Sequence, residues 1–433
     1  MNIPLDRLYH YIENIAQEIY SDRIIIYRFW PHGSKNINDL NNLHKSDGWF
    51  EKTVFPTIWC NDQEPLDYEF YRTNIRIWPN DEWISILKLF NYFTLPTNLN
   101  YSPVTIFEKE LLLHSEKQSD NLKKYQDDNE LIPVYYWSHA LIALDWFRFA
   151  KHETFQKSTK KTFLIYNRAW SGTREYRLRF SDLLIERNLI DQCQTSCNPV
   201  DPGLNIHYTS HKFSNPAWRP TNVLENFLSP TTADSASSAD FDTQDYNSTD
   251  IEVVLETLFD DGRLHLTEKS LRPIACGQPF ILAGTQGSLE YLRSYGFKTF
   301  GDVWDESYDL VEDPTERLIQ IAELMKYISN WLPHQRERNM AKAQEIANYN
   351  RQHFFSQEFF DLVVSELTTN LRLAFDQLNQ GNNYIDWINR FKNLMTYPEV
   401  LKFLESNQKF QSPSKSQVDF IMNLAQLKLE NKT

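Results

Sequence analysis

The residues with the clearest potential for chemistry lie in the stretch LTEKSLRPIACGQPFIL, from Leu266 to Leu282. Thr267 is a suitable N-cap and Gly277 a suitable C-terminal stop, so the pattern predicts a helix over residues 268–276. Pro273 stands inside this helix and cannot donate to the carbonyl four residues earlier. We therefore expect its first turns to be distorted.

The start of this helix combines groups that suit a nucleotide diphosphate. A helix N-terminus presents N–H groups without intrahelical partners and the positive end of the helix dipole. Lys269 and Arg272 are three residues apart and share a face, so with the amides they predict a diphosphate site. Glu268 can accept both hydroxyls of a ribose, as an acidic residue does in dinucleotide sites. The alternative is a solvated helix surface, where such charges are common.

The elements that position these residues are predicted by apolar runs that alternate with helical patterns. The runs in the first 150 residues are RIIIYRFW, TVFPTIWCNDQEP, ELLLHSEK and IPVYYWSHALIALDWFRFA. The pattern restarts with TFLIYN, the loop RAWSGT and an amphipathic helix, and IEVVLETLF and QPFILAG are the predicted strands around 268–276. This alternation is typical of a parallel α/β sheet.

We therefore expect an α/β protein with two Rossmann-like domains that face a cleft. The first covers residues 1–150 and the second 151–330, and a helical C-terminal region follows over 331–433. The polar, acidic segment 229–250 is predicted to be a mobile insertion in the second domain.

Composition narrows the classes of partner. The chain has 433 residues and a formal net charge of −14, which argues against broad nucleic-acid binding but leaves room for a local basic cleft. Its four cysteines lack zinc-site spacing, so we expect reduced thiols and no metal site. The N-terminus lacks the features of a signal peptide, and no apolar run reaches membrane-spanning length. A cytoplasmic protein without a membrane span is the expectation.

The block from Glu252 to Asp309 resembles the nucleotide-sugar domain of glycosyltransferases with the two-Rossmann (GT-B) architecture. It is most similar to fucosyltransferase-like and phage-encoded members, which share a TEK helix start, a following basic residue and a G-x-P turn into a strand. The block FLIYNR…REYR, from Phe163 to Arg177, is similar to the opening strand, loop and helix of such domains.

The resemblance implies which residues hold the donor, a nucleotide-diphosphate sugar. Glu268, next to the N-cap Thr267, would hold the ribose, and Lys269 and Arg272 would hold the diphosphate. Glu256 would also face the donor. Arg168, Arg174 or Arg177 would add positive charge near the phosphates, or would lie on a solvated helix face. Such enzymes usually need no metal, and we expect no other cofactor.

An inverting transfer also needs a base that takes a proton from the acceptor hydroxyl. We expect it from the first domain, where Asp62 and Glu64 follow a predicted strand and Asp62 is the first choice. His139 is the second, although it could instead orient the acceptor or cap a helix. His114 and Glu116 are further candidates, and a retaining mechanism would need no such base.

The predicted function is transfer of a sugar to a hydroxyl of a glycan or lipopolysaccharide intermediate. One alternative is a phage-type enzyme that glycosylates a modified DNA base. Another is a non-catalytic module that binds a nucleotide or a partner on the same fold, because a fold does not fix a function. The sequence leaves the sugar, the nucleotide base and the oligomeric state open.

Overall fold

The computed structural model describes residues 15, 25–29, 58–62, 66, 110–127, 131–224 and 241–379. These residues belong to two compact units. The β1–β4 unit contains strands β1 to β4, most of helix α6 and the part of helix α14 from Glu366 onward. The β5–β10 unit contains residues 116–120 and the described residues between Trp137 and Ser365.

The β1–β4 unit is built on a parallel sheet. Its strands pair in chain order, and they are β1 (Ile25–Phe29), β2 (Ile58–Asp62), β3 (Glu110–His114) and β4 (Leu131–Tyr135). Leu111, Leu112 and Leu113 of β3 are fully buried, as expected for a strand covered on both faces. Helix α6 (Asp120–Asp127) lies between β3 and β4 in the chain. All four predicted strands are confirmed.

The β5–β10 unit contains a second parallel sheet, with the strand order β10-β9-β5-β6. Its strands are β5 (Lys161–Asn167), β6 (Cys193–Cys197), β9 (Thr249–Leu255) and β10 (Phe280–Ala283). The chain steps from β5 to β6 in one direction and later from β9 to β10 in the other. The order therefore reverses between β5 and β9, and open α/β sheets bind ligands beyond the carboxyl ends of the strands at such a point.

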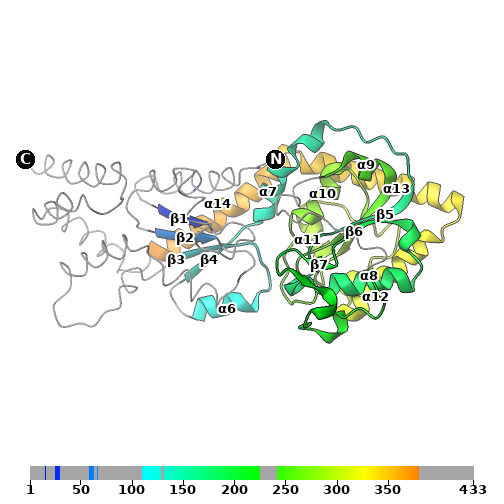
Figure 1. Ribbon diagram of the computed structural model, residues 1–433. Helices are drawn as coiled ribbons and strands as arrows, with labels where there is room; N and C mark the ends of the chain where they lie inside the picture. The colour runs from blue at the N-terminus through cyan, green and yellow to red at the C-terminus, as the bar shows by residue number, and fades with distance from the viewer. Residues whose placement is uncertain are drawn as a thin grey trace, which may run out of the picture. The chain divides into compact units, whose positions relative to one another are not determined.

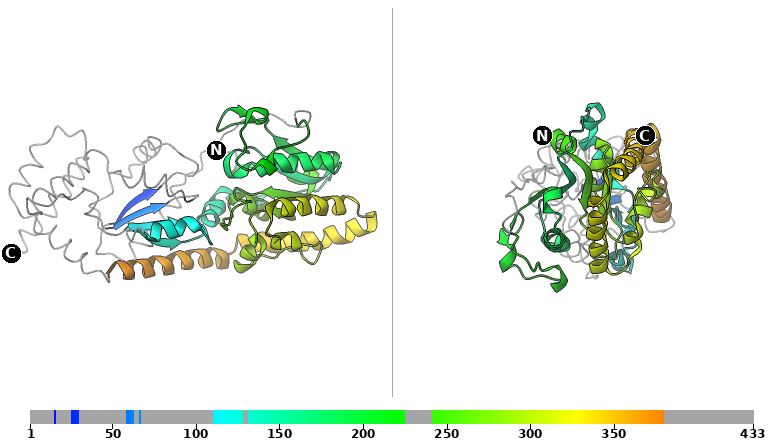
Figure 2. Two further views of the ribbon diagram at one scale, coloured as in Figure 1. Left: turned by 90° about the horizontal axis from the view of Figure 1, so that it is seen from below. Right: turned by 90° about the vertical axis from the view of Figure 1, so that its right-hand side faces the viewer.

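Helices surround this second sheet. Helix α8 lies beside α12 and α10 packs against α13, and Figures 1 and 2 show these pairs on different sides of the sheet. The helices of this unit are α7 (Ser138–Trp146), α8 (Tyr176–Glu186), α9 (Thr243–Ser248), α10 (Glu268–Cys276), α11 (Ser288–Ser294), α12 (Pro314–Ser329), α13 (Pro333–Phe354) and the part of α14 (Gln357–Asn379) up to Ser365. A small antiparallel ladder joins β7 (Val200–Asp201) to β8 (Ile206–His207).

The chain is thus a mixed α/β protein with parallel sheets and a helical C-terminal region, as predicted. The pairing of two Rossmann domains around a cleft, and the domain boundaries, stay predictions.

The segment predicted as a mobile insertion is partly regular structure. Thr243–Ser248 forms α9, whose N-cap Asp242 accepts the N–H of Gln244. Tyr246 is fully buried and donates to Glu252. Composition suggested a loop because the segment is polar and small, but one buried tyrosine anchors it to the sheet. Residues 229–240 lie outside the described residues.

Candidate functional site

Helix α10 begins and ends where the sequence predicts. The hydroxyl of Thr267 accepts the N–H of Lys269 at 3.4 Å, which makes it the N-cap. Gly277 ends the helix in the left-handed conformation, at φ 67°, which glycine adopts without steric cost. Because Thr267 comes twelve residues after the end of β9, α10 starts near the carboxyl edge of the sheet.

Glu256 fixes the start of α10. It follows β9 directly, is fully buried, and accepts the backbone N–H of Thr267 at 3.1 Å. Its carboxylate also accepts the hydroxyls of Thr267 (2.7 Å) and Ser270 (2.5 Å) and the N–H of Thr257 (3.1 Å). Four protein donors thus occupy the two oxygens, and this favours a positioning role for Glu256 over a donor contact.

Glu268 is a buried carboxylate held between two bases. It is 3% exposed, with Oε1 2.6 Å from Lys269 Nζ and Oε2 3.1 Å from His139 Nδ1. Burial alone would raise its pKa, but Lys269 and His139 outweigh burial and hold the pKa well below its usual range. The carboxylate is therefore charged at neutral pH. Each oxygen offers two lone pairs, so both keep capacity for a sugar hydroxyl.

Arg174 is a cation at this edge with hydrogen-bonding capacity that the described residues do not use. It is half-buried, and its Nε donates to the carbonyl of Ser171 at 3.4 Å. Its two terminal nitrogens have no hydrogen-bond partner among the described residues. Burial first, and then repulsion from Arg177 and Arg168, lowers the pKa of Arg174 to about 10.

Lys269 and Arg174 are cations whose charged forms are destabilised by burial. The pKa of Lys269 is lowered chiefly by burial, with a further contribution from Arg177, although Glu268 and Glu256 oppose the change. The acid Glu268 and the bases Lys269 and Arg174 therefore all have lowered pKa values. An anion placed here would stabilise the charged forms of these buried cations.

The structure brings Arg168 and Arg177 to the same edge in different roles. Arg168 directly follows β5, beside the end of β9, and acts electrostatically on Arg174. Arg177 is buried and donates to the carbonyls of Ala169 (2.7 Å) and Leu255 (2.6 Å). Arg177 therefore ties the strand ends together, whereas Arg168 and Arg174 supply charge to the site.

Arg272 is paired with an acid inside the protein, which favours a structural role. Its guanidinium is 7% exposed, its Nη2 lies 2.6 Å from Glu252 Oε1, and it stacks on the ring of Tyr166 at 4.4 Å. Helical spacing suggested that Arg272 would join Lys269 on one diphosphate, but its charge is paired inside the protein. The amides at the helix start also have protein partners, since the N–H of Glu268 faces His139 Nδ1 at 3.3 Å.

Of the predicted bases, His139 lies in the β5–β10 unit. It is in the first turn of α7, 2% exposed and in contact with Glu268, so it belongs to the predicted donor side and not to the acceptor side. Asp62 ends β2, and Glu64 lies outside the described residues, so both stay predictions. Glu116 is buried and paired with Arg263 at 3.1 Å, which favours a structural role.

Asp201 is a residue that the sequence reasoning missed. Its carboxylate accepts the backbone N–H groups of Trp170 (3.0 Å) and Ser171 (2.9 Å), and so fixes the loop that carries Arg174. The same side chain accepts the N–H groups of Gly203 and Leu204. The turn sequence Asp-Pro-Gly at 201–203 marked a bend, but not its contact with a loop thirty residues earlier.

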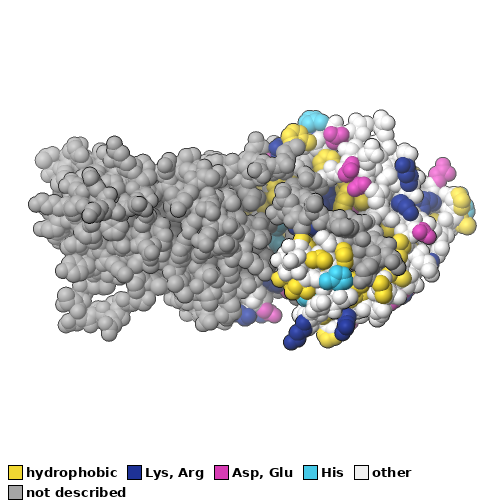
Figure 3. Space-filling view, in the orientation of Figure 1, with side chains coloured by type: hydrophobic (Ala, Val, Ile, Leu, Met, Phe, Trp, Pro, Cys, Tyr) yellow, Lys and Arg dark blue, Asp and Glu magenta, His cyan; other side chains and the backbone are white. Residues whose placement is uncertain are grey.

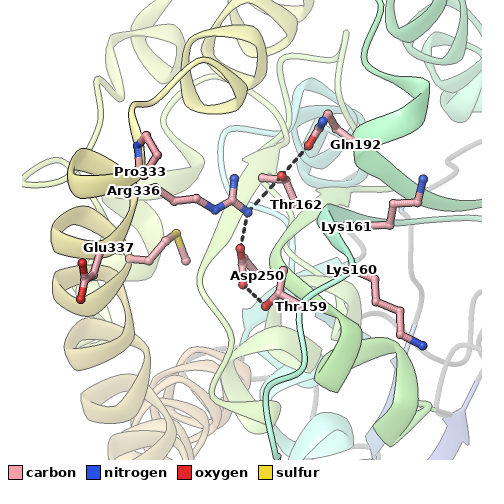
Figure 4. A pocket seen from close by; sticks show the side chains of 10 residues that line it. Thr159, Lys160, Lys161, Thr162, Gln192, Asp250, Pro333, Arg336 and Glu337 are labelled. Atoms are coloured by element: carbon pink, nitrogen blue, oxygen red, sulfur yellow. Dashed lines mark hydrogen bonds and ion pairs between the residues drawn. The ribbon is translucent and has the colours of Figure 1, made fainter.

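A hollow of about 560 Å³ lies at the opposite edge of the sheet (Figure 4). Arg336 of α13 crosses it to Asp250 and Thr162, Thr159 donates to Asp250, and Thr162 donates to Gln192. These polar groups are paired with one another. The carboxyl edge, where the terminal nitrogens of Arg174 have no partner among the described residues, is therefore the stronger candidate site.

Within the described ranges, no helix has both the length and the apolar character of a membrane span. The same residues contain no cluster of three or more His, Cys, Asp or Glu side chains that could hold a metal ion. No protein-family model, curated protein or solved structure matches the chain.

Proposed function

We propose that the protein is a glycosyltransferase that uses a nucleotide-diphosphate sugar and binds its diphosphate and ribose at the start of α10. The observation that carries the proposal is a buried, charged Glu268 with Lys269 and the incompletely hydrogen-bonded Arg174 beside it, at the carboxyl edge of a parallel sheet. Both charge types are needed there, because the diphosphate requires cations and the ribose hydroxyls require an acceptor.

The roles of the residues follow from their contacts. Glu268 accepts the ribose hydroxyls, while Lys269 and Arg174 face the phosphates and Arg168 adds long-range charge. As the glycosidic bond breaks, negative charge grows on the leaving diphosphate. Cations that are already held in place stabilise this charge without reorganising. Asp62 remains the proposed base for an inverting transfer.

A glycan or lipopolysaccharide intermediate is the proposed acceptor class. On the face seen in Figure 3, basic and acidic side chains of the described part are interspersed and form no single basic patch. With a net charge of −14, this favours an acceptor other than DNA. Glycosylation of a modified DNA base is the alternative, and its binding would weaken steeply with salt.

The test is a thermal-shift panel of GDP, UDP, ADP and CMP with their sugar conjugates, on wild type and Glu268→Ala. We expect one nucleotide class to raise the melting temperature of wild type and to lose this effect in the variant. A charge-assisted hydrogen bond is worth about 1.5–3 kcal/mol, so affinity should fall at least tenfold. Glu345→Ala, at an exposed position of α13, is the matched control.

Turnover separates an enzyme from a binding module. Release of the nucleotide from the donor that binds, lost in Glu268→Ala, would support catalysis. Selective binding without turnover, with any acceptor offered, would favour the non-catalytic module. If no nucleotide or nucleotide sugar shifted the melting temperature, the proposal would be wrong.

A further inference from the structure

We infer that His139 is a positioning residue of the donor site, and that the proton on its Nδ1 determines how Glu268 and the start of α10 are held. The inference rests on the proposed function, because it concerns the carboxylate that is proposed to bind the ribose. It assigns His139 to the donor and not to the acceptor hydroxyl.

One nitrogen of His139 faces two groups with opposite requirements. Nδ1 lies 3.1 Å from Glu268 Oε2, and this contact needs a proton on Nδ1. The same Nδ1 lies 3.3 Å from the backbone nitrogen of Glu268, and accepting that N–H needs a lone pair. An imidazole nitrogen can donate or accept, but cannot do both at once. The start of α10 therefore has two alternative hydrogen-bond patterns.

The ring of His139 is held in place between these alternatives. It is 2% exposed and makes an edge contact with His265 at 5.1 Å between ring centroids. Trp137, two residues earlier, donates from Nε1 to the carbonyl of Leu266 at 2.9 Å, which fixes the start of α7 against the segment before α10. The proton can therefore change the hydrogen bonds without a large movement of the ring.

Charged and titratable groups surround His139 on several sides. Helix α10 contributes Glu268 and Lys269, and His265 comes from the segment before it. Arg174 acts on Glu268 from the loop after β5. The 3-10 helix Arg148–His152 also packs on α7, and Arg148 donates a hydrogen bond of 2.6 Å to the carbonyl of Asp145.

With a proton on Nδ1 and charge on the ring, His139 holds Oε2 while Lys269 holds Oε1. The carboxylate is then fixed between two cations, and the N–H of Glu268 is released to face a ligand. With a lone pair on Nδ1, His139 accepts that N–H and no longer donates to Oε2. Affinity for the donor should therefore rise as pH falls through the histidine range, about pH 8 to 5.

The experiment is calorimetric titration with the nucleotide sugar selected by the panel, across that pH range. The phosphates of a nucleotide sugar do not titrate there, so the ligand contributes no pH dependence of its own. We expect wild-type affinity to rise about tenfold towards the acid end, the size of one charge-assisted hydrogen bond. His139→Asn, whose amide lies near the Nδ1 position and does not titrate, should give a flat profile.

His334→Asn, at an exposed position in α13, is the matched control and should keep the wild-type profile. If His139→Asn does not fold, Glu268→Gln replaces it, because a neutral amide at position 268 should also flatten the profile. A profile as steep in these variants as in wild type would overturn the inference and leave the proposed function intact. A wild type that binds no nucleotide sugar would overturn both.

Discussion

Helix α10 carries two buried acid–base pairs that look alike by distance alone. Lys269 Nζ lies 2.6 Å from Glu268 Oε1, and Arg272 Nη2 lies 2.6 Å from Glu252 Oε1. The two bases are three residues apart in the same helix. Their surroundings nevertheless differ, and the difference distinguishes a structural ion pair from a candidate binding site.

The Arg272–Glu252 pair is buried and covered by neighbouring side chains. Tyr246 donates to Glu252, and the ring of Tyr166 covers Arg272. The two charges are matched, and attraction to Glu252 outweighs burial and raises the pKa of Arg272, although its Nε has no hydrogen-bond partner among the described residues. Beside Glu268, by contrast, the two terminal nitrogens of Arg174 have no hydrogen-bond partner among the described residues. A short ion pair is therefore weak evidence for a binding site, whereas a neighbouring cation with unused hydrogen-bond donors is stronger evidence.

The largest expected effect tests the Arg272–Glu252 pair. Arg272→Met should destabilise the protein by about 3–5 kcal/mol, because it leaves Glu252 as an uncompensated buried charge. Urea unfolding measures the change in free energy. Arg338→Met, at an exposed position, should stay within about 0.5 kcal/mol of wild type. A stable Arg272→Met protein with weaker nucleotide binding would remove the distinction between the two pairs.

A smaller effect concerns how the Glu268–Lys269 pair contributes to the stability of the protein at acid pH. The pKa of Glu268 lies below its ordinary value of 4.5 in the folded state, so its ion pairs stabilise the fold above 4.5. This contribution is lost as pH falls through the folded-state pKa. As pH falls from 7 to below 4.5, wild type should therefore lose more stability than Glu268→Gln, as measured by the midpoints of urea unfolding. Parallel pH profiles of the two proteins would contradict the assignment.

The smallest effect concerns the N-cap of α10, next to the Glu268–Lys269 pair. Thr267→Ala removes the cap and one donor to Glu256, and should cost about 1 kcal/mol of unfolding free energy. Thr267→Ser keeps the hydroxyl and should behave like wild type. Thermal or urea unfolding of the two variants gives the comparison. Equal losses in both would mean that the methyl group, and not the cap, carries the effect.

The sequence predicted the parts of this site that depend on local chemistry. Thr267 and Gly277 set the ends of α10 because capping needs only neighbouring residues. The strands that flank α10 were visible as apolar runs, and the approach of Lys269 to Glu268 is a contact between adjacent residues.

Contacts between distant residues could not be read from spacing. Arg272 pairs with Glu252 twenty residues earlier, a contact that helical spacing alone did not indicate. His139 meets Glu268 across 129 positions, and nothing local to YYWSHAL indicates that contact. In both cases the contact depends on how the elements pack against one another, which the local pattern does not specify.

The most direct test of the central claim, that the cations at the start of α10 bind a diphosphate, is calorimetric titration of Arg174→Ala. With the nucleotide sugar that binds wild type, this variant should lose about 1.5–3 kcal/mol of binding free energy. Its stability should stay within about 0.5 kcal/mol of wild type, because Arg174 makes one long hydrogen bond and is repelled by Arg177. Arg338→Ala should bind as wild type does. Unchanged affinity in a folded Arg174→Ala protein would contradict the account.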